Sequence, residues 1–398
     1  MHGEVHTSDS TLNGTSRLKG DNKNCRQWIN KITSMRRFSR TVCLGSVLAL
    51  ALSSGDSARK EGLLSDDSKE GRQGAEAPQA KDRIRTHVSE VIVPVTVTDK
   101  KGELVLNLEQ KDFHVFDKGV EQRIGRFEVD ADPLAVALIV ETNLRLQAIA
   151  PVIRGMGSIF TETVMALSGE ATVVSYDSTV EVHQAFTRDH DAVEKAIANL
   201  PFWASDRHLY DAMAKGVELL KSQPPPYRRI LLVIGESQDY HSHAKLSEVM
   251  RDAQLANVII YAVGPSSSAA DLRYGKDEQP GQRPPPTINL PKLPPIAAGL
   301  DSSYAAVAIW LLTRGTNEIS NHQLEVAAAS TGGVHYRALH EESIRKALDR
   351  IGGELHAQYV LGYAPNPDAY AGFNEINVTV ARSNVTVRTR PGYFVVLE

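Results

Sequence analysis

The sequence predicts an α/β fold with a mainly parallel sheet and helices on both faces, flanked by a small β domain from the N- and C-terminal segments. Residues 134–140 form one continuous apolar run, which is typical of a strand buried on both faces of a parallel sheet. From there to residue 355, apolar runs alternate with segments whose apolar residues recur every three or four positions. In the segments before and after, apolar residues recur mostly every second position, which indicates half-buried strands.

The N-terminal part is interpreted as an extension and signal peptide at residues 1–58. A basic run at 35–40 precedes an apolar stretch at 42–52, and small residues follow it. This stretch is shorter than the roughly 20 residues that span a bilayer, so we expect a secreted or periplasmic protein. An uncleaved membrane anchor is the alternative. Residues 59–86 are polar without an apolar period and are predicted to be a disordered spacer.

The remaining chain divides into three segments. Residues 87–130 form a β segment, with strands expected near 88–97 and 113–116. The α/β domain is predicted at 133–355 and the second β segment at 356–398. The two β segments are expected to pair with each other, because neither has enough strands to be stable alone.

The expected elements of the α/β domain follow from the apolar pattern. A Pro-rich insertion at 265–300 carries eight of the 19 prolines and is predicted to be a surface excursion. Strands are expected at 134–140, 171–176, 230–234, 258–263 and 334–336, and helices at 146–167, 193–200, 209–220, 246–256, 303–330 and 341–355.

Composition excludes several classes of function. The chain has 398 residues, 42% of them hydrophobic and 23% charged, as in an ordinary globular protein. Its 44 Lys and Arg against 48 Asp and Glu give a net charge of -4, so we expect no nucleic acid among its partners. Both cysteines, Cys25 and Cys43, lie near the N-terminus. A cysteine-based zinc site, a thiol nucleophile and a disulfide framework are therefore excluded for the rest of the chain.

Six short motifs occur in a fixed order along the chain. They are residues 93–99 (VPVTVTD), 112–119 (DFHVFDKG), 209–212 (LYDA), 331–333 (TGG), 358–363 (QYVLGY) and 390–393 (RPGY). The ordered set resembles the von Willebrand factor type A (VWA)-related proteins of the acidobacterial type, over about residues 86–397. The resemblance implies an exported bacterial protein with a Rossmann-like VWA binding domain and no catalytic chemistry, and therefore not an enzyme.

The resemblance also implies where a metal site would lie. VWA domains bind a divalent metal at the carboxyl ends of the strands through Asp-x-Ser-x-Ser, a Thr and an Asp, and such oxygen ligands suit Mg²⁺. This chain departs from the pattern at every position: Glu141, Asn143 and Arg145 take the first motif, Arg207 the Thr, and Glu236 lies near the last Asp.

Arginine changes the chemistry expected at this position. It has no acceptor atom and keeps its charge, so it cannot ligate a cation. We therefore hypothesise that guanidinium groups replace the metal, with Glu141 and Glu236 facing Arg145 and Arg207, and we expect no cofactor. The alternative is a shifted alignment in which Ser205, Asp206 or Asp239 keeps a weak magnesium site.

Other constellations are less specific. His241 and His243 offer two imidazoles on one loop, but no third ligand lies nearby in sequence, so a solvated loop is favoured over a transition-metal site. A hydrolase would need Ser237 with Asp239 and one of these histidines, although the segment lacks the second glycine of a nucleophile elbow. Trp203 is expected either to pack in the core or to expose an aromatic anchor near Arg207.

The sequence therefore predicts an exported protein-binding module for adhesion or interaction, with a degenerate, metal-free site and no catalytic residues. The expected partner is a protein. The alternatives are a structural or assembly subunit of the cell envelope, a VWA protein that retains weak magnesium binding, and a hydrolase acting through Ser237.

Overall fold

The structure is a computed structural model that describes residues 90–129, 133–203, 206–264, 302–314, 319, 322–338, 340–365 and 371–395. The predicted signal peptide, the spacer, the Pro-rich insertion and Ser205 lie outside the described residues. No helix among the described residues is long and apolar enough to cross a membrane.

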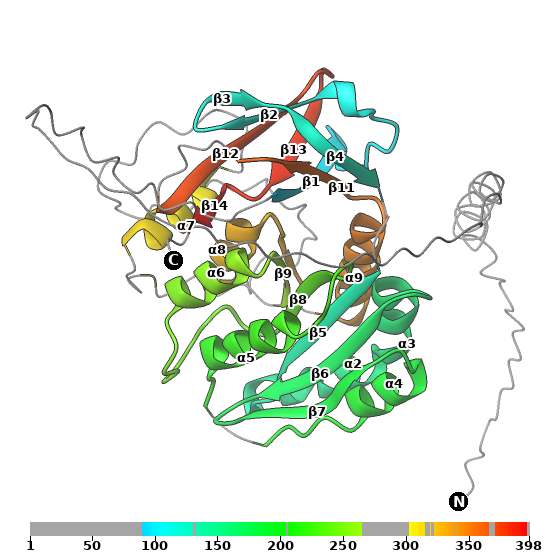
Figure 1. The fold of residues 1–398 in the computed structure, drawn as a ribbon. Helices are drawn as coiled ribbons and strands as arrows, with labels where there is room; N and C mark the ends of the chain where they lie inside the picture. Colours follow the sequence, from blue (N-terminus) through cyan, green and yellow to red (C-terminus); the bar gives the residue numbers. More distant parts are fainter. Residues whose placement is uncertain are drawn as a thin grey trace, which may run out of the picture. The chain divides into compact units, whose positions relative to one another are not determined.

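A six-stranded sheet in the order β10-β9-β8-β5-β6-β7 forms the centre of the α/β part (Figure 1). All neighbouring strands pair in parallel except β6 and β7, which are antiparallel. All eight residues of β5 are buried, because helices cover both faces of the sheet. The strands are β5 (Leu134–Glu141), β6 (Glu170–Tyr176), β7 (Val180–Thr187), β8 (Arg228–Ile234), β9 (Val258–Gly264) and β10 (His335–Arg337).

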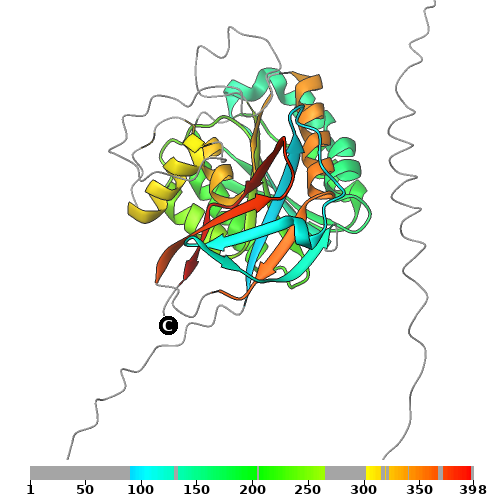
Figure 2. The ribbon, with the colours of Figure 1, turned by 90° about the horizontal axis from the view of Figure 1, so that it is seen from above.

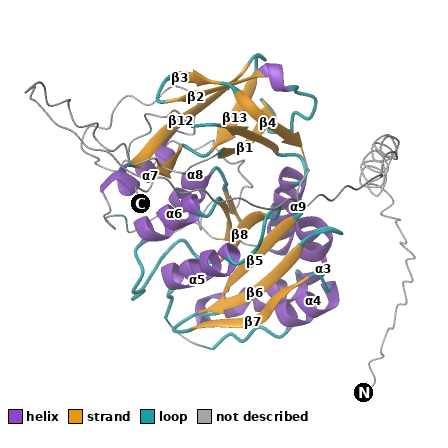
Figure 3. Cartoon of the chain, in the orientation of Figure 1, coloured by secondary structure: helices purple, strands orange, loops and turns teal. Residues whose placement is uncertain are grey.

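Each face of the sheet has its own apolar core, and Figure 3 shows helices on both sides of the strands. Alternate side chains of β5, such as Leu138 and Ile139, enter opposite cores. One core is closed by α2 (Ala150–Gly155), α3 (Gly157–Ile159), η3 (Phe160–Met165), α4 (His190–Ala198) and α9 (Glu341–Leu355). The other is closed by α5 (Leu209–Lys221), α6 (Leu246–Leu255), α7 (Ser302–Arg314) and α8 (Gln323–Thr331).

The single helix expected at 146–167 is wrong. The segment instead contains a 3-10 turn, η2 (Leu144–Ile149), then α2, α3 and the π-helical turn η3. Pro151 stands in the first turn of α2, where its missing N–H costs nothing, and so starts a new helix there. Gly155 and Gly157, which follow in the same segment, have low helix propensity. A Cβ on Gly157 would lie 3.2 Å from the Cα of Glu194, so glycine here allows close packing on α4.

The N- and C-terminal β segments pair with each other in two four-stranded sheets, β13-β1-β11-β4 and β14-β12-β2-β3. Figure 2 shows the N-terminal strands in blue and cyan beside the C-terminal strands in orange and red. The two sheets share one apolar core. Their elements are β1 (Val91–Asp99), η1 (Gln110–Asp112), β2 (Phe113–Asp117), β3 (Val120–Gln122), β4 (Ile124–Val129), β11 (Tyr359–Tyr363), β12 (Gly372–Val380), β13 (Val385–Thr389) and β14 (Gly392–Val395).

A buried carboxylate links these sheets to the α/β part. Glu354 of α9 has only 4% of its side chain exposed and forms an ion pair with Arg388 of β13. Its Oε1 also accepts hydrogen bonds from Thr96 of β1 at 3.0 Å and from Tyr261 of β9 at 2.5 Å. One carboxylate therefore joins residues from four elements.

Candidate functional site

The candidate site lies where parallel strands end side by side. Glu141 closes β5 and is paired in register with Tyr176, which closes β6. Gly235 and Glu236 follow the neighbouring strand β8. A Cβ on Gly235 would lie 2.5 Å from the Tyr176 hydroxyl and 2.7 Å from Glu141 Oε2, so a side chain here would not fit. The absence of a side chain lets the backbone after β8 approach the Glu141 carboxylate.

Glu141 is fully buried, and protein donors contact both of its oxygens. Oε2 accepts the backbone N–H of Glu236 at 2.5 Å and the Tyr176 hydroxyl at 3.4 Å, and Oε1 accepts from Nδ2 of Asn143. Burial raises the pKa of Glu141 to about 7, and the negative charge of Glu236 adds to this effect. The Glu236 N–H, the Arg207 charge and the Tyr176 hydroxyl oppose the rise without cancelling it.

Arg207 supplies the positive charge inside this site. Only 5% of its side chain is exposed. One terminal nitrogen donates to Glu236 Oε2, and its Nε lies 4.0 Å from Glu141 Oε1. The Cζ atom lies 4.5 Å from the centre of the Tyr240 ring, and the Tyr240 N–H donates to the Arg207 carbonyl at 2.8 Å. Contacts from Tyr240 thus hold both the backbone and the guanidinium of Arg207.

Asn143 and Arg145 complete the predicted set from the loop after β5. Asn143 Oδ1 caps η2 by accepting the N–H groups of Arg145 at 2.9 Å and Leu146 at 3.3 Å. The Nε of Arg145 lies 3.4 Å from Glu236 Oε2, but 64% of its side chain is exposed. The structure therefore brings all five predicted residues together, with Arg207 buried and Arg145 at the surface.

Large apolar side chains are exposed next to these arginines. Leu144 adjoins Arg145 and is 47% exposed, and Tyr240, which stacks on Arg207, is 46% exposed. Trp203 is 73% exposed, so the predicted packing in the core is wrong. This combination of aromatic, aliphatic and Arg side chains is typical of protein-binding surfaces.

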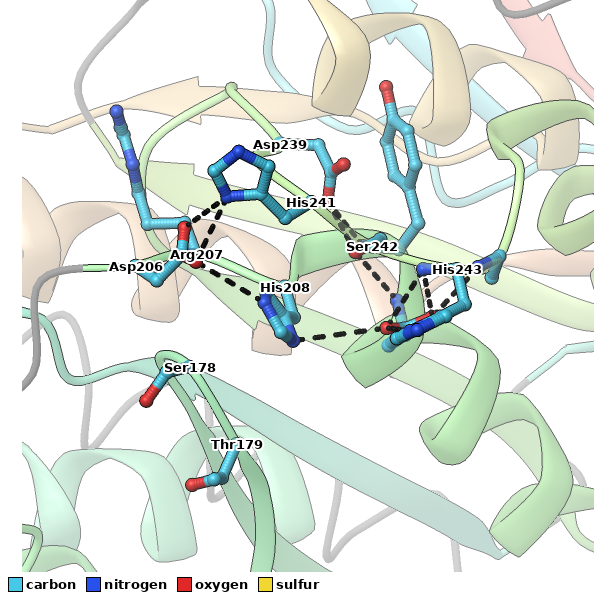
Figure 4. A network of polar contacts seen from close by, with 12 residues as sticks. Ser178, Thr179, Asp206, Arg207, His208, Asp239, His241, Ser242 and His243 are labelled. Carbon is cyan, nitrogen blue, oxygen red and sulfur yellow. Dashed lines mark hydrogen bonds and ion pairs between the residues drawn. The ribbon is translucent and has the colours of Figure 1, made fainter.

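Beside the site, acidic and histidine side chains alternate (Figure 4). The Nδ1 atom of His241 lies 3.0 Å from Asp206, and that of His243 lies 3.3 Å from Asp211. His208 lies between the two carboxylates, 3.5 Å from Asp206 and 3.9 Å from Asp211. His241 and His243 thus face different carboxylates. No group of three or more His, Cys, Asp or Glu residues within the described part of the chain is arranged to hold a metal ion.

The hydrolase and weak-magnesium alternatives rely on Ser237, Asp239 and Asp206. Each of these side chains forms hydrogen bonds that neither alternative predicts. Ser237 is fully buried and donates to Glu325 at 2.6 Å, so its hydroxyl bonds to none of the predicted triad partners. Asp239 accepts the N–H of Tyr210 at 3.0 Å and the Ser242 hydroxyl at 2.6 Å, and so supports the first turn of α5. Asp206 is bonded to His241, as described above.

Burial and charge compete at Glu325. Burial alone would raise its pKa, but the charge of His335 and the hydrogen bonds from His322 and Ser237 lower it to about 2. His335 lies 3.5 Å from Glu325, and His322 lies 3.1 Å from it. Ser237 therefore belongs to a buried network of charged and polar groups.

Sequence reasoning missed three contacts of the site: Tyr176, Gln238 and Tyr240. Tyr176 has a sequence signal, because it ends the strand next to β5 and parallel strands bring their last residues to one edge. Gln238 accepts from Arg207 at 3.4 Å, two positions after Glu236. No spacing rule identifies Gln238 or Tyr240, because the loop after β8 sets their positions.

Comparisons with known proteins give only distant similarities. An aerotolerance-related membrane protein from Bacteroides fragilis has a TM-score of 0.35 at 9% identity, covering 55% of this chain and 98% of its own. BatB from Bacteroides thetaiotaomicron has a TM-score of 0.35 at 11% identity, covering 56% and 98%. The SpRpn10 VWA domain has a TM-score of 0.28 at 12% identity, covering 35% and 78%. The sequence matches no protein-family model and no curated protein. Similarities at these TM-scores give no information about function.

Proposed function

We propose that the protein is an exported, VWA-type protein-binding module whose site works without a metal and binds carboxylates of a partner protein through Arg145. One observation carries the proposal: the buried Arg207 guanidinium contacts Glu236 and lies 4.0 Å from Glu141, while Arg145 beside it is 64% exposed. One arginine neutralises the buried carboxylates, and the other is available to a partner.

The donor set at this position does not fit Mg²⁺. The ion takes about six oxygen ligands in near-octahedral geometry. Here the Glu141 oxygens already accept hydrogen bonds from Asn143, Tyr176 and the Glu236 backbone. The Arg207 guanidinium bonds to the remaining carboxylate, and its positive charge repels a cation. The Arg207 guanidinium supplies one positive charge at this place, where Mg²⁺ would supply two, and Arg145 adds a second positive charge at the surface.

A calorimetric titration of dialysed protein with Mg²⁺ and Mn²⁺ tests the metal-free site. We expect no stoichiometric binding. Binding of one equivalent that disappears in Glu141→Gln would refute the proposal, because it would make Glu141 a metal ligand.

The exposed face fits a partner that carries both acidic and apolar groups. Arg145 offers its guanidinium to carboxylates, the adjoining Leu144 is exposed, and Tyr240, which stacks on Arg207, adds a second exposed apolar group. Arginine and tryptophan frequently dominate the binding energy of interfaces. Export rests on the basic and apolar pattern of residues 35–58 and belongs to the same proposal.

A differential capture experiment tests the docking face. Envelope proteins of the native organism are passed over immobilised wild type, Arg145→Ala, and the control Arg251→Ala, in which an arginine 51% exposed on α6 is removed. We expect a partner that wild type and control retain and that Arg145→Ala binds about tenfold or more weakly, with an unchanged melting temperature. Unchanged capture combined with a lower melting temperature in Arg145→Ala would instead favour the structural or assembly subunit.

A further inference from the structure

A second site lies at the other ends of the parallel strands. A cavity of about 470 Å³ opens where β8 and β9 begin, and residues of β1, β4 and β11 also line it. Much of the lining is aliphatic, including Ile92, Val258 and Val360. Four arginines and a single acidic residue, Glu90, lie among these apolar groups. Mostly apolar walls with a few convergent polar groups are typical of small-molecule sites.

Arg390 is a buried cation bonded only to neutral acceptors. It is 4% exposed, and burial lowers its pKa to about 10. Its guanidinium donates to Asn257 Oδ1 at 2.8 Å and to the carbonyls of Gly392 at 2.8 Å, Gln254 at 3.2 Å and Ile92 at 3.4 Å. Within the described residues no carboxylate contacts it. A buried charge without a counter-charge is costly.

Arg229, a half-buried residue of the same cavity, also donates only to neutral acceptors. Its terminal nitrogens donate to the carbonyls of Ala256 at 2.8 Å and Gln223 at 2.7 Å. Its Nε is buried and has no hydrogen-bond partner among the described residues. Burial lowers its pKa, and no carboxylate acts against that shift. Arg229 donates to Ala256 and Arg390 to Asn257, so both guanidinium groups lie at the loop between α6 and β9.

We propose that this cavity binds a small organic anion, whose carboxylate or phosphate group pairs with Arg229 and Arg390 and whose apolar part packs on the aliphatic lining. The anion supplies the counter-charge that both guanidinium groups lack, and a charged acceptor strengthens hydrogen bonds from a guanidinium. Arg126, also in the lining, already pairs with Glu128 at 2.7 Å and is not needed for this role. The lining of this cavity shares no residue with the candidate site around Glu141 and Arg207.

Four eight-carbon probes test the proposal on the full chain by titration calorimetry: octanoate, octyl phosphate, octanol and octylammonium. We expect one equivalent of an anionic probe to bind, and octanol and octylammonium not to bind. The preference between octanoate and octyl phosphate identifies the anionic group. Arg229→Met should weaken binding about tenfold or more, because a charged hydrogen-bonding partner is lost, while Arg251→Met should leave it unchanged.

Methyl NMR of the wild-type protein provides a second test of anion binding, which does not require Arg229→Met to fold. The methyl signals of Val258 and Val360 should shift with the bound anion and not with octylammonium. Equal binding of octanol, unchanged affinity in a folded Arg229→Met, or the absence of anion-dependent shifts would each overturn the proposal.

Discussion

Replacing Arg207 by methionine tests whether a guanidinium neutralises the buried carboxylates. Methionine fills a similar volume along the side-chain stem but carries no charge, so the packing changes little. Glu141 would then be left without its only buried counter-charge among the described residues, since Arg145 contacts Glu236 alone. Breaking one partner of a buried ion pair costs about 3–5 kcal/mol of unfolding free energy. Because Arg207 is 5% exposed, the full buried range applies, and we expect a loss of about 3 kcal/mol or more at pH 8.

The loss of unfolding free energy in Arg207→Met should be larger at high pH than at low pH. The pKa of Glu141 is about 7 in the folded protein against an ordinary value of 4.5. The folded state therefore binds more protons between these values, and this group makes wild-type stability fall as pH rises from about 4.5 to 7. Without Arg207 the pKa of Glu141 rises further, so in the variant the fall continues above pH 7. The gap between wild type and variant should widen from pH 6 to pH 8, by at most about 1.4 kcal/mol per pH unit.

Urea denaturation at pH 6 and pH 8 measures this gap. Arg145→Met is the matched control and should lose no more than about 1 kcal/mol at either pH, because exposed ion pairs contribute little. In the Glu141→Gln background, the pH dependence of the Arg207→Met effect should disappear. A loss below about 1 kcal/mol at pH 8, or equal losses at both pH values, would refute the reasoning.

Three further predictions concern other contacts. The double substitution Arg145→Ser and Arg207→Thr introduces the hydroxyls of the VWA pattern. About 10 mM Mg²⁺ should raise the melting temperature of this variant by about 3 °C and leave that of the wild type unchanged. Equal responses of the two proteins would contradict this prediction. Arg388→Met leaves Glu354 buried without its ion-pair partner and should cost about 3 kcal/mol in urea denaturation, whereas a loss below about 1 kcal/mol would show that this pair does not stabilise the sheets. Ser237→Ala removes a buried hydrogen bond and should cost about 1–3 kcal/mol of unfolding free energy; an esterase activity lost in this variant would instead favour the hydrolase.

Buried strands were predictable from sequence, whereas β7 and β3, two edge strands made mostly of exposed or half-buried residues, were not. β5 has eight buried residues in succession, so its continuous apolar run identifies it directly. β7 (Val180–Thr187) was missed because it lies at the sheet edge, none of its residues is buried, and its polar residues mask the pattern. β3 (Val120–Gln122) is short and mostly exposed and was missed for the same reason.

The candidate site was predictable where backbone geometry fixes it. Glu141 ends β5 and Glu236 follows β8, so counting from the strand ends places both at one edge of the sheet. The family resemblance placed Arg207 at the same site, and its pairing with these carboxylates was then expected from charge, because buried carboxylates need a counter-charge. The different exposures of Arg145 and Arg207 did not follow, because loop conformation decides which arginine lies under Tyr240.

Arg207 and Arg390 are both buried arginines, but they support two different proposals, a metal-free site and an anion-binding cavity. Both are buried, and burying a guanidinium costs free energy unless an opposite charge lies close by. Two carboxylates approach Arg207, so the protein itself balances that charge. Around Arg390, as far as the described chain extends, the acceptors are an amide side chain and backbone carbonyls. An internally balanced arginine supports the proposed metal-free site, and an unbalanced one beside a cavity supports the proposal that the missing charge arrives with a ligand.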